Sequence, residues 1–317
     1  MRVVRVFAPA TVANVAVGFD LLGFAIDGIG ETIEMERIDG RAEIIIEEVP
    51  GYPDLPRVPV ENTATAGLVQ LISDMKLNFG FRIRIKKEIP IGSGLGGSAA
   101  SAVAGIFAAN QFLKKKLKPP ELLHYALLGE EVASHALHAD NVAPCLHGGL
   151  VFAGPAPEFR IHRIRTPKSL ACAVLLPDLQ IKTSESRGQL KRLITLAQHV
   201  EQSANLVGFL MGCVEGDFDL MRRFLRDVII EPQRAPQIPG FDEFKYLALK
   251  CGALGCSISG SGPAIFALTE NMKVAKRVEL EWRKQAKMLR VPIRGTWSSA
   301  ISKRGARLLP ATKKAQR

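Results

Sequence analysis

The chain has 317 residues, of which 47% are hydrophobic and 23% charged, and it carries a formal net charge of +11. This composition is that of an ordinary globular protein and excludes a disordered, collagenous or coiled-coil chain. A chain of this length predicts two domains, because a single core stops growing at about 250–300 residues. The longest apolar stretches, such as residues 146–154, fall far short of the roughly 20 residues that a membrane span needs, so we expect no membrane partner.

Two features point to the cytoplasm. Residues 1–8 form an alternating pattern without the apolar core or cleavage site of a secretory signal. The five cysteines are odd in number and lack the CxxC spacing of metal or redox sites, which is typical of reduced core residues. We therefore expect a cytoplasmic protein.

The positive charge is concentrated at the C-terminal end. Residues 271–317 contain 14 Lys and Arg against two Glu, a balance of +12, and the rest of the chain sums to −1. Such a segment is compatible with nucleic acid or an acidic partner. However, Val274, Val278 and Trp282 form the single apolar stripe of a surface helix, and no nucleic-acid-binding motif accompanies it. We favour a solvated helix with a basic tail and predict no nucleic-acid partner.

The first half of the chain reads as strands followed by helices. In chain order we expect strands on both sides of a loop at 14–23, a strand at 81–85, helices at about 98–111 and 119–138, a loop up to Gly148, and a strand at 150–153. The alternation of Phe81, Ile83 and Ile85 with basic residues is the clearest strand signal. The proline-bearing segment 155–167 is the best boundary candidate, and we place the N-terminal domain at residues 1–160.

The second half predicts a ferredoxin-like unit. In chain order we expect a strand at 171–176, helices at 183–197, 199–214 and 217–227, strands at 254–258 and 264–268, the basic helix, and a strand at 291–297. Strand, helices, two strands, helix and strand is the βαββαβ order of that fold. The C-terminal domain is therefore expected at residues 161–317.

The strongest local signal is a glycine-rich segment between a predicted strand and a predicted helix. Its glycines let the backbone approach a ligand closely, and the helix N-terminus offers free N–H groups and a positive dipole end. These features predict a phosphate-binding loop. Its residues are Pro90, Ile91, Gly92, Ser93, Gly94, Leu95, Gly96, Gly97, Ser98, Ala99 and Ala100.

Two better-known phosphate loops fit this segment less well. The P-loop pattern requires Lys-Ser/Thr after the last glycine, which this chain lacks. Gly92, Gly94 and Gly97 match the dinucleotide fingerprint. However, basic residues 114–118 stand where that fold requires a strand ending in an acidic residue.

Glu130 stands out because it falls on the apolar stripe of the second predicted helix, seven residues after Leu123. A buried carboxylate is rare unless it is paired or bound to metal. Together with the Ser98 hydroxyl it would suit a Mg²⁺ ion held by few protein groups and by the phosphates of a nucleotide. A glutamate at the edge of the stripe, paired with a neighbouring lysine, fits the spacing equally well.

The glycine-rich segment resembles the phosphate loop of the GHMP kinases, the superfamily of galactose, homoserine, mevalonate and phosphomevalonate kinases. Segments 8–20, 138–144 and 258–263 resemble homoserine kinases within it, in family order. The resemblance implies a two-domain α+β fold, with an N-terminal domain like domain 2 of ribosomal protein S5 and a ferredoxin-like C-terminal domain. It also implies phosphorylation of the L-homoserine hydroxyl by ATP with Mg²⁺, in threonine biosynthesis, and a homodimer.

The resemblance also assigns roles to individual residues. The substrate-binding residues that it implies are Asn14, Asp20, His138, Arg187, Arg234 and Gly260. The catalytic residues that it implies are Asp140, Asn141 and Thr183. It places Asn62 beside the adenine, although Asn62 by itself reads as a helix N-cap. An amino-acid substrate needs a carboxylate for its ammonium and a cation for its carboxylate, which suits arginine.

The sequence leaves several alternatives open. Asp140 has the chemistry of a general base for the hydroxyl proton, but direct transfer of that proton to the phosphate fits as well. Gly97 stands where the family usually has serine, and Ala16 replaces a common glycine. The rival functions are a GHMP kinase for mevalonate or a related alcohol, and a non-catalytic binding protein that keeps the fold.

Overall fold

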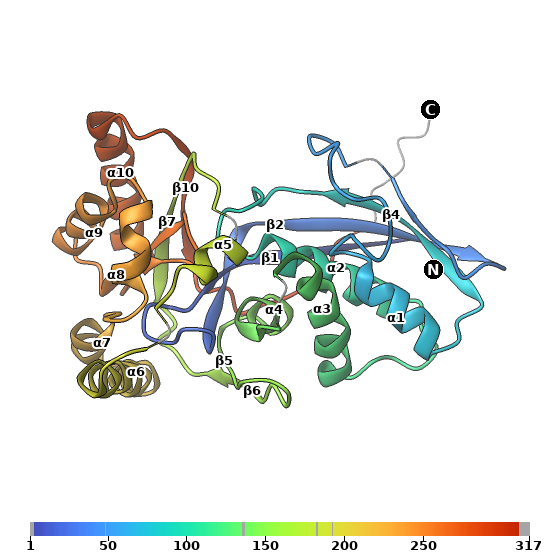
Figure 1. The fold of residues 1–317 in the computed structure, drawn as a ribbon, viewed down its shortest axis with the longest axis horizontal. Coiled ribbons are helices and arrows are strands. Elements are labelled where there is room, and N and C mark those ends of the chain that lie inside the picture. The colour runs from blue at the N-terminus through green and yellow to red at the C-terminus, as the bar shows by residue number, and fades with distance from the viewer. Residues whose placement is uncertain (1–2, 48, 135–136, 182, 192, 311–317) are drawn as a thin grey trace.

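The computed structural model describes residues 3–47, 49–134, 137–181, 183–191 and 193–310. Within these residues the strands form two sheets, one of seven strands and one of four, and helices pack against each sheet (Figure 1). No described helix is long and apolar enough to cross a membrane.

The larger sheet is built on two long antiparallel strands, β1 and β2. Its strands are β1 (Val3–Ala13), β2 (Leu22–Asp39), β3 (Ile44–Ile46), β4 (Phe79–Lys86), β5 (Leu150–Ala153), β6 (Ile161–Ile164) and β11 (Arg307–Leu308). The order is β11-β1-β2-β4-β3, with β5 paired to β2 and β6 paired to β5. The register places Val6 beside Ile33 and Ile33 beside Ile85, so alternate residues of the central strands form one buried apolar face.

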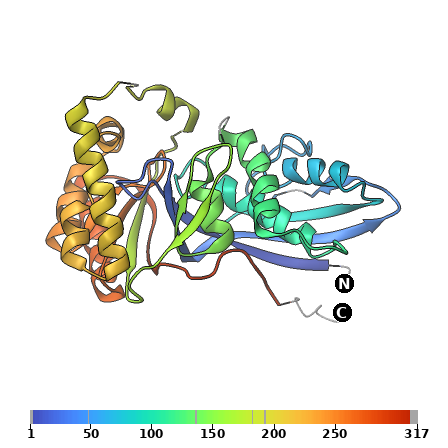
Figure 2. The same cartoon turned by 90° about the horizontal axis from the view of Figure 1, so that it is seen from below.

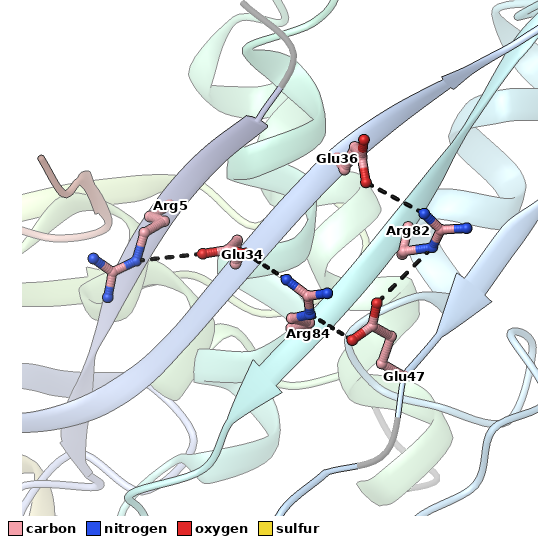
Figure 3. Close-up of polar contacts among 6 residues, drawn as sticks. All are labelled: Arg5, Glu34, Glu36, Glu47, Arg82 and Arg84. Atoms are coloured by element: carbon pink, nitrogen blue, oxygen red, sulfur yellow. Dashed lines mark hydrogen bonds and ion pairs between the residues drawn. The ribbon is translucent and has the colours of Figure 1, made fainter. Parts of the chain in front are cut away.

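The opposite face of this sheet carries a ladder of alternating charges across β1, β2, β4 and the end of β3 (Figure 3). Its members are Arg5, Glu34, Glu36, Glu47, Arg82 and Arg84. The Nη1 of Arg84 donates to Glu34 Oε1 at 3.0 Å, and Arg82 Nη1 lies 3.4 Å from Glu36 Oε2. Because these side chains meet solvent, each pair adds at most about 1 kcal/mol to stability. The ladder marks the solvent face of the sheet.

Four helices cover the buried face of the larger sheet (Figures 1 and 2). They are α1 (Ala66–Asp74), α2 (Gly97–Asn110), α3 (Pro119–Ser134) and α4 (Ala139–His147). The helix α2 lies against β1 and β2, because most of its residues are small and nearly all are buried. This packing fixes the glycine-rich segment at the N-terminus of α2 against the end of β1.

The smaller sheet contains β7 (Ala171–Pro177), β8 (Gly255–Ile258), β9 (Ile265–Thr269) and β10 (Ile293–Ala300). Its order, β10-β7-β9-β8, is antiparallel throughout, with the first strand in the chain between the fourth and third, and it confirms the expected βαββαβ unit. The helices of this half are α5 (Thr183–Gly188), α6 (Leu196–Glu215), α7 (Phe218–Phe224), α8 (Glu231–Arg234), the 3₁₀ turn Ala235–Gln237, α9 (Phe241–Lys250) and α10 (Met272–Leu289). The basic helix α10 buries Val278 and Trp282, as its stripe predicts.

Three details of the expected elements are wrong. The segment before Gly148 is the helix α4 and not a loop. Its internal Pro144 cannot donate to the carbonyl of Asp140, and β2 approaches there so closely that a Cβ on Gly23 would lie 1.8 Å from that carbonyl oxygen. The helix expected at 183–197 ends at Gly188, and α6 starts after Thr195, which forms a capping box with Gln198. The helix α9 was not expected, and the helix that Asn62 was expected to cap, α1, has Thr65 as its N-cap instead.

The expected domain boundary falls within a β-hairpin. β6 pairs with β5, so the larger sheet extends through Ile164, and β11 returns to pair with β1. Strand β7, from Ala171, is the first strand of the smaller sheet. The division at residues 160 and 161 stays a prediction, and the pairing of β6 and β11 argues for assigning both strands to the N-terminal unit.

Candidate active site

A cavity of about 430 Å³ gathers most of the residues that the sequence singled out. Its walls come from the β1–β2 loop, the glycine-rich segment, α3, α4, α5, α8 and the β8–β9 loop. The predicted residues that line it are Asn14, Asp20, Pro90, Ile91, Gly92, Ser93, Gly94, Gly96, Gly97, Ser98, Glu130, His138, Asp140, Asn141, Arg187, Arg234 and Gly260. Asn14 and Gly260, which are 246 positions apart in the chain, therefore share one cavity.

Four of the predicted residues whose side chains the structure describes do not line this cavity. Leu95, Ala99 and Ala100 are completely buried beneath the glycine-rich segment and support it. The amide of Asn62 is occupied by its own loop: its Nδ2 donates to Pro56 O at 2.7 Å, and its Oδ1 accepts from the N–H of Ala64 at 2.9 Å. Its neighbour Thr63 lines the cavity instead, and α1 takes Thr65 as its N-cap. The side chain of Thr183 lies outside the described residues.

The glycine-rich segment is held between β1 and the β8–β9 loop. The hydroxyl of Ser259 donates to Gly94 O at 2.7 Å, and the N–H of Thr11 donates to Leu95 O at 3.1 Å. Gly94 has a φ of 78°, and a Cβ there would lie 2.5 Å from Ser259 O. No described side chain caps the N-terminus of α2. Its first N–H groups therefore point to a space suited to an anion.

Two buried carboxyl groups lie beyond this helix terminus. Ser98, in the first turn of α2, forms a side-chain hydrogen bond with Glu130 of α3. Burial raises the pKa of Glu130 to about 7, and the charge of Asp140 adds to the shift. Burial likewise raises the pKa of Asp140, in the first turn of α4, to about 7. A cation between the phosphates and these groups would favour their charged forms, so the donor set fits Mg²⁺.

The described residues contain no cluster of three or more His, Cys, Asp and Glu side chains that could hold a metal ion by itself. A magnesium ion here would depend on Ser98, Glu130 and the oxygens of a bound nucleotide, which is how proteins commonly hold Mg²⁺.

Lys87 is a cavity residue that the sequence did not single out. It follows β4, and its side chain is only 6% exposed. Its Nζ lies 3.4 Å from Glu31 Oε1 and donates to Ser101 Oγ at 3.1 Å. Burial raises the pKa of Glu31 to about 7, although Lys87 opposes the shift. Lys87 therefore supplies a cation below the glycine-rich segment. In the sequence it was one basic residue among several in an alternating strand.

The other end of the cavity carries charges of both signs. Asp20 accepts two hydrogen bonds from Arg187, at 2.7 and 3.0 Å, and its backbone N–H donates to Asn14 Oδ1 at 3.0 Å. The Nδ2 of Asn14 donates to Gly260 O at 3.0 Å. His138 Nδ1 lies 3.7 Å from Asp20 Oδ2, and burial lowers the pKa of His138. This end offers an anionic oxygen pair held in a fixed orientation.

Arg234 supplies a second cation at the same end. It is 3% exposed, and its Nη1 donates to Gly260 O at 2.7 Å. Its Nε is buried without a hydrogen-bond partner among the described residues. Burial, and then the charge of Arg187, lower its pKa. Both guanidinium groups lie near the ring of Phe19, at 5.3 and 5.5 Å. A buried donor of this kind fits a ligand carboxylate.

Asn141 is fixed by a residue that the sequence analysis missed. The hydroxyl of Thr11, at the end of β1, donates to Asn141 Oδ1 at 2.7 Å. A Cβ on Gly96 would lie 2.1 Å from that same hydroxyl. The β-strand, the glycine-rich segment and α4 therefore meet at one point. Thr11 lies in the segment 8–20 that resembles the family, but the sequence does not reveal this contact, because it joins residues 130 positions apart.

Two segments of the chain match family models of known kinases. Residues 62–149 match the GHMP kinases N terminal domain, and residues 209–287 match the GHMP kinases C terminal domain. The chain belongs to the GHMP kinase family. Family membership and the two-part α+β fold expected from the sequence are both confirmed.

Curated relatives of this GHMP kinase cover most of its length. It is 44% identical over 273 residues to a homoserine kinase of Xylella fastidiosa, which spans 86% of this chain and 84% of the relative. It is 38% identical over 320 residues to a homoserine kinase of Chlorobium phaeobacteroides, covering 98% and 100% of the two chains. The crystal structure of homoserine kinase from Cytophaga hutchinsonii is 37% identical and superimposes with a TM-score of 0.93 over 98% of each chain.

A mevalonate kinase from L. major is similar in fold alone, at 14% identity and a TM-score of 0.69. The general architecture therefore extends to kinases of other alcohols, and the identity of the substrate depends on the side chains of the cavity.

Proposed function

We propose that this GHMP kinase transfers the γ-phosphoryl group of ATP to the side-chain hydroxyl of L-homoserine, giving O-phospho-L-homoserine for threonine biosynthesis. The observation that carries the proposal is the division of the cavity into two ends. One end has the glycine-rich segment and the uncapped N-terminus of α2, and the other has Asp20, Arg187 and Arg234. The homoserine kinases that resemble this chain over most of its length support the same substrate.

At the first end, the phosphates of ATP would receive hydrogen bonds from the backbone of the glycine-rich segment. Lys87 and the dipole of α2 offset part of their negative charge. The loop that Asn62 holds in place, with Leu55 and Thr63 at the cavity wall, would border the adenine. Mg²⁺, held by Ser98, Glu130 and phosphate oxygens, would neutralise charge on the transferred group.

At the second end, homoserine would bind through both of its backbone charges. The carboxylate accepts hydrogen bonds from Arg234, whose buried Nε has no partner among the described residues. The ammonium donates to Asp20, which Arg187 and Asn14 hold in orientation. His138 and Gly260 complete this end. Since both groups of the amino acid are held, its hydroxyl would be directed toward the phosphates, and positioning of this kind contributes much of the rate.

Asp140 is the residue that we propose as acceptor of the hydroxyl proton. It lies between the two ends, and burial raises its pKa to about 7, close to the value of an efficient base at neutral pH. Asn141, fixed by Thr11, would hold the hydroxyl or a phosphate oxygen by hydrogen bonding. Thr183 would contact the substrate or the phosphates from the start of α5. Transfer of the proton to the phosphate itself is the alternative route.

An ATP-coupled phosphorylation assay over L-homoserine, mevalonate and galactose tests the proposal. We expect turnover with homoserine and none above background with the other two alcohols. Asp140→Asn should lower kcat by about 10² to 10⁴ if Asp140 is the base, and by much less if the phosphate takes the proton. Turnover with mevalonate alone would contradict the proposed substrate. Binding of ATP without turnover on any alcohol would favour a non-catalytic protein.

We propose a homodimeric assembly and a cytoplasmic location for this kinase, with small molecules as its ligands and no nucleic-acid or membrane partner. The reaction consumes two soluble metabolites, which suits such a location.

A further inference from the structure

The proposed partners of the two charges of homoserine lie on two separate segments of the chain. Asp20, for the ammonium, belongs to the loop between β1 and β2, and Arg234, for the carboxylate, ends the short helix α8. In an amino acid both charged groups are bonded to one carbon atom, so their separation is fixed. Both charges can bind at once only if the two segments are held at a matching separation.

The β1–β2 loop has a backbone conformation that needs support from outside. Asn14, Val15, Ala16 and Asp20 have positive φ values of 67°, 47°, 57° and 59°. Residues other than glycine rarely adopt this conformation, and a β-branched residue such as Val15 is a clear exception. Such a backbone persists only where surrounding contacts hold it. The contacts of this loop with the rest of the chain therefore determine where Asp20 lies.

The α8 segment also depends on outside contacts. Helix α8 is a single turn of four residues, which is too short to be stable by itself. The carboxylate of Asp227 fixes its start. Its Oδ1 accepts hydrogen bonds from the N–H groups of Ile229 and Ile230, at 2.8 and 2.9 Å, and its Oδ2 accepts from Glu231 N–H at 2.9 Å. Because these bonds order the start of the turn that ends at Arg234, the place of Arg234 depends on what holds the residues around Asp227.

Gln202 of α6 is bonded to both segments. Its Nε2 donates to Val17 O in the β1–β2 loop at 3.1 Å, and its Oε1 accepts from Val228 N–H, next to Asp227, at 3.0 Å. One orientation of the amide serves both partners, because the carbonyl needs a donor and the N–H needs an acceptor. Helix α6, yellow in Figure 2, therefore joins the two segments through one side chain.

The two segments meet a second time at the wall of the cavity. Gly260 O accepts from Asn14 Nδ2 at 3.0 Å and from Arg234 Nη1 at 2.7 Å. Gly260 lines the cavity and Gln202 does not. A bound amino acid would thus contact the residues around Gly260, and Gln202 would act only through the segments that it joins.

We infer that Gln202 is a positioning residue for homoserine, which sets the separation between Asp20 and Arg234. The inference rests on the proposed function and deepens it, since it names what matches the site to an ammonium and a carboxylate on one carbon. Without this amide the β1–β2 loop relaxes away from α8, and homoserine no longer engages both partners in their best geometry.

Gln202→Met tests this role, because methionine keeps the length and helix propensity of glutamine but cannot donate to Val17 O. We expect the KM for homoserine to rise about tenfold and the KM for ATP to change less than about twofold, since the nucleotide end keeps its own supports. Steady-state kinetics with each substrate varied in turn measures both constants. The control Asn271→Ala removes the side-chain cap of α10 and should lower the thermal midpoint while both KM values stay unchanged.

Two further variants separate positioning from general stability. In an Arg234→Lys background the carboxylate contact is already impaired, so adding Gln202→Met should raise the homoserine KM less than about threefold further. Gln202→Glu keeps the bond from Val228 N–H but places a carboxylate oxygen against Val17 O, and it should raise the homoserine KM at least as much as Gln202→Met. Thermal midpoints check that each variant is folded.

The outcomes distinguish this inference from the proposed function. Equal rises in both KM values, or a full tenfold further rise in the Arg234→Lys background, would make Gln202 a structural residue and overturn its positioning role. An unchanged homoserine KM in Gln202→Met and Gln202→Glu would overturn the inference and leave the proposed function standing. A wild-type protein without turnover on homoserine would overturn the proposed function and the inference together.

Discussion

At the scale of single residues, the two arginines of the cavity differ because their neighbours differ. Arg187 shares its charge with Asp20 through two hydrogen bonds. Arg234 is 3% exposed, has no ion pair among the described residues, and donates only one described hydrogen bond, to Gly260 O. Desolvation of a guanidinium without a counter-ion is unfavourable, so Arg234 is the group whose environment improves when an anion binds.

Arg234→Lys should weaken homoserine binding much more than ATP binding. The substitution keeps the charge but replaces two parallel N–H donors by one compact ammonium. Loss of a charge-assisted hydrogen bond costs about 1.5–3 kcal/mol, so the KM for homoserine should rise roughly tenfold to hundredfold. Steady-state kinetics with each substrate varied in turn measures both constants, and Arg223→Lys on the exposed side of α7 is the control. Equal rises in both KM values would make Arg234 a phosphate-binding or structural residue.

Glu130→Gln should raise the magnesium concentration needed for half-maximal turnover and lower kcat, without loss of the fold. The amide keeps the shape of the side chain, and the pKa of about 7 at Glu130 means that the ligand-free site already accepts its neutral form. What the variant loses is a negative ligand for the cation. A titration of kcat against free Mg²⁺, with a thermal midpoint for each protein, measures the effect. An unchanged magnesium dependence would rule out Glu130 as a ligand.

At the scale of elements, two glycines of the glycine-rich segment differ in what their positions require. Gly94 stands at a position that needs glycine, and Gly97 does not. Gly94 combines a φ of 78° with backbone oxygens of the β8–β9 loop 2.5 and 2.8 Å from a built Cβ. At Gly97 φ is not positive, and the nearest atom to a built Cβ is a methyl carbon of Ile89 at 3.1 Å. The backbone at residue 97 therefore does not require glycine. The conformation of the backbone does not explain why this chain lacks the serine that the family usually has there.

Gly94→Ala should destabilise the protein and raise the KM for ATP, since it introduces backbone strain of about 1–3 kcal/mol and pushes the segment away from the β8–β9 loop. Gly97→Ser should change the thermal midpoint much less, because a small shift of Ile89 makes room for it. Thermal denaturation of both variants, with ATP titrations, compares the two positions. Equal destabilisation by the two substitutions would contradict this account of the segment.

The C-terminal strand β11 belongs to the N-terminal sheet, so a truncation before β11 and a truncation after it should have different effects. Deletion of residues 310–317 removes three basic residues but keeps the bond from the N–H of Leu309 to Arg5 O, so kinase activity and stability should be unchanged. Deletion of residues 305–317 also removes β11 and the bond from Ala306 N–H to Cys145 O, and it should lower the thermal midpoint by several degrees. A large loss of turnover after the shorter deletion would show that the tail supports the active site.

At the scale of the whole molecule, three buried carboxyl groups link stability to pH. Burial raises the pKa of Glu31, Glu130 and Asp140 from ordinary values of 4.5, 4.5 and 3.8 to about 7. In each case the folded state holds the proton more tightly than the unfolded state. The stabilisation is therefore complete below the unfolded values and is lost as pH rises through about 7.

The thermal midpoint of the ligand-free protein should fall as pH rises from about 5 to 8. Asp140→Asn should flatten part of this slope, because an amide has no proton to lose in that range. Saturating Mg²⁺ and ATP should flatten it further, since a bound cation favours the charged carboxylates. Differential scanning calorimetry across this range measures the slope, and a midpoint that rises with pH would contradict the protonated state of these groups.

The sequence by itself determined the features that depend on short stretches of chain. The glycine-rich segment, the place of Glu130 on an apolar stripe and the alternation of strand β4 are all local patterns, and they depend on helix and strand periodicity and on the backbone freedom of glycine. The order of elements in the second half was sufficient for the ferredoxin-like sheet. The family resemblance implied that Asp20, Arg187 and Arg234 bind the substrate, and the structure places all three at one end of a cavity.

Only the tertiary structure decided contacts between distant parts of the chain. The Lys87–Glu31 pair joins β2 to the residue that follows β4, and Thr11 reaches Asn141 across 130 positions. The helix α4 contains Pro144, which local propensity penalises, and burial of its apolar side against β1 and β2 outweighs that preference. A one-dimensional pattern reports propensity and periodicity, whereas partners, burial and pKa shifts arise only after the sheets and helices have packed.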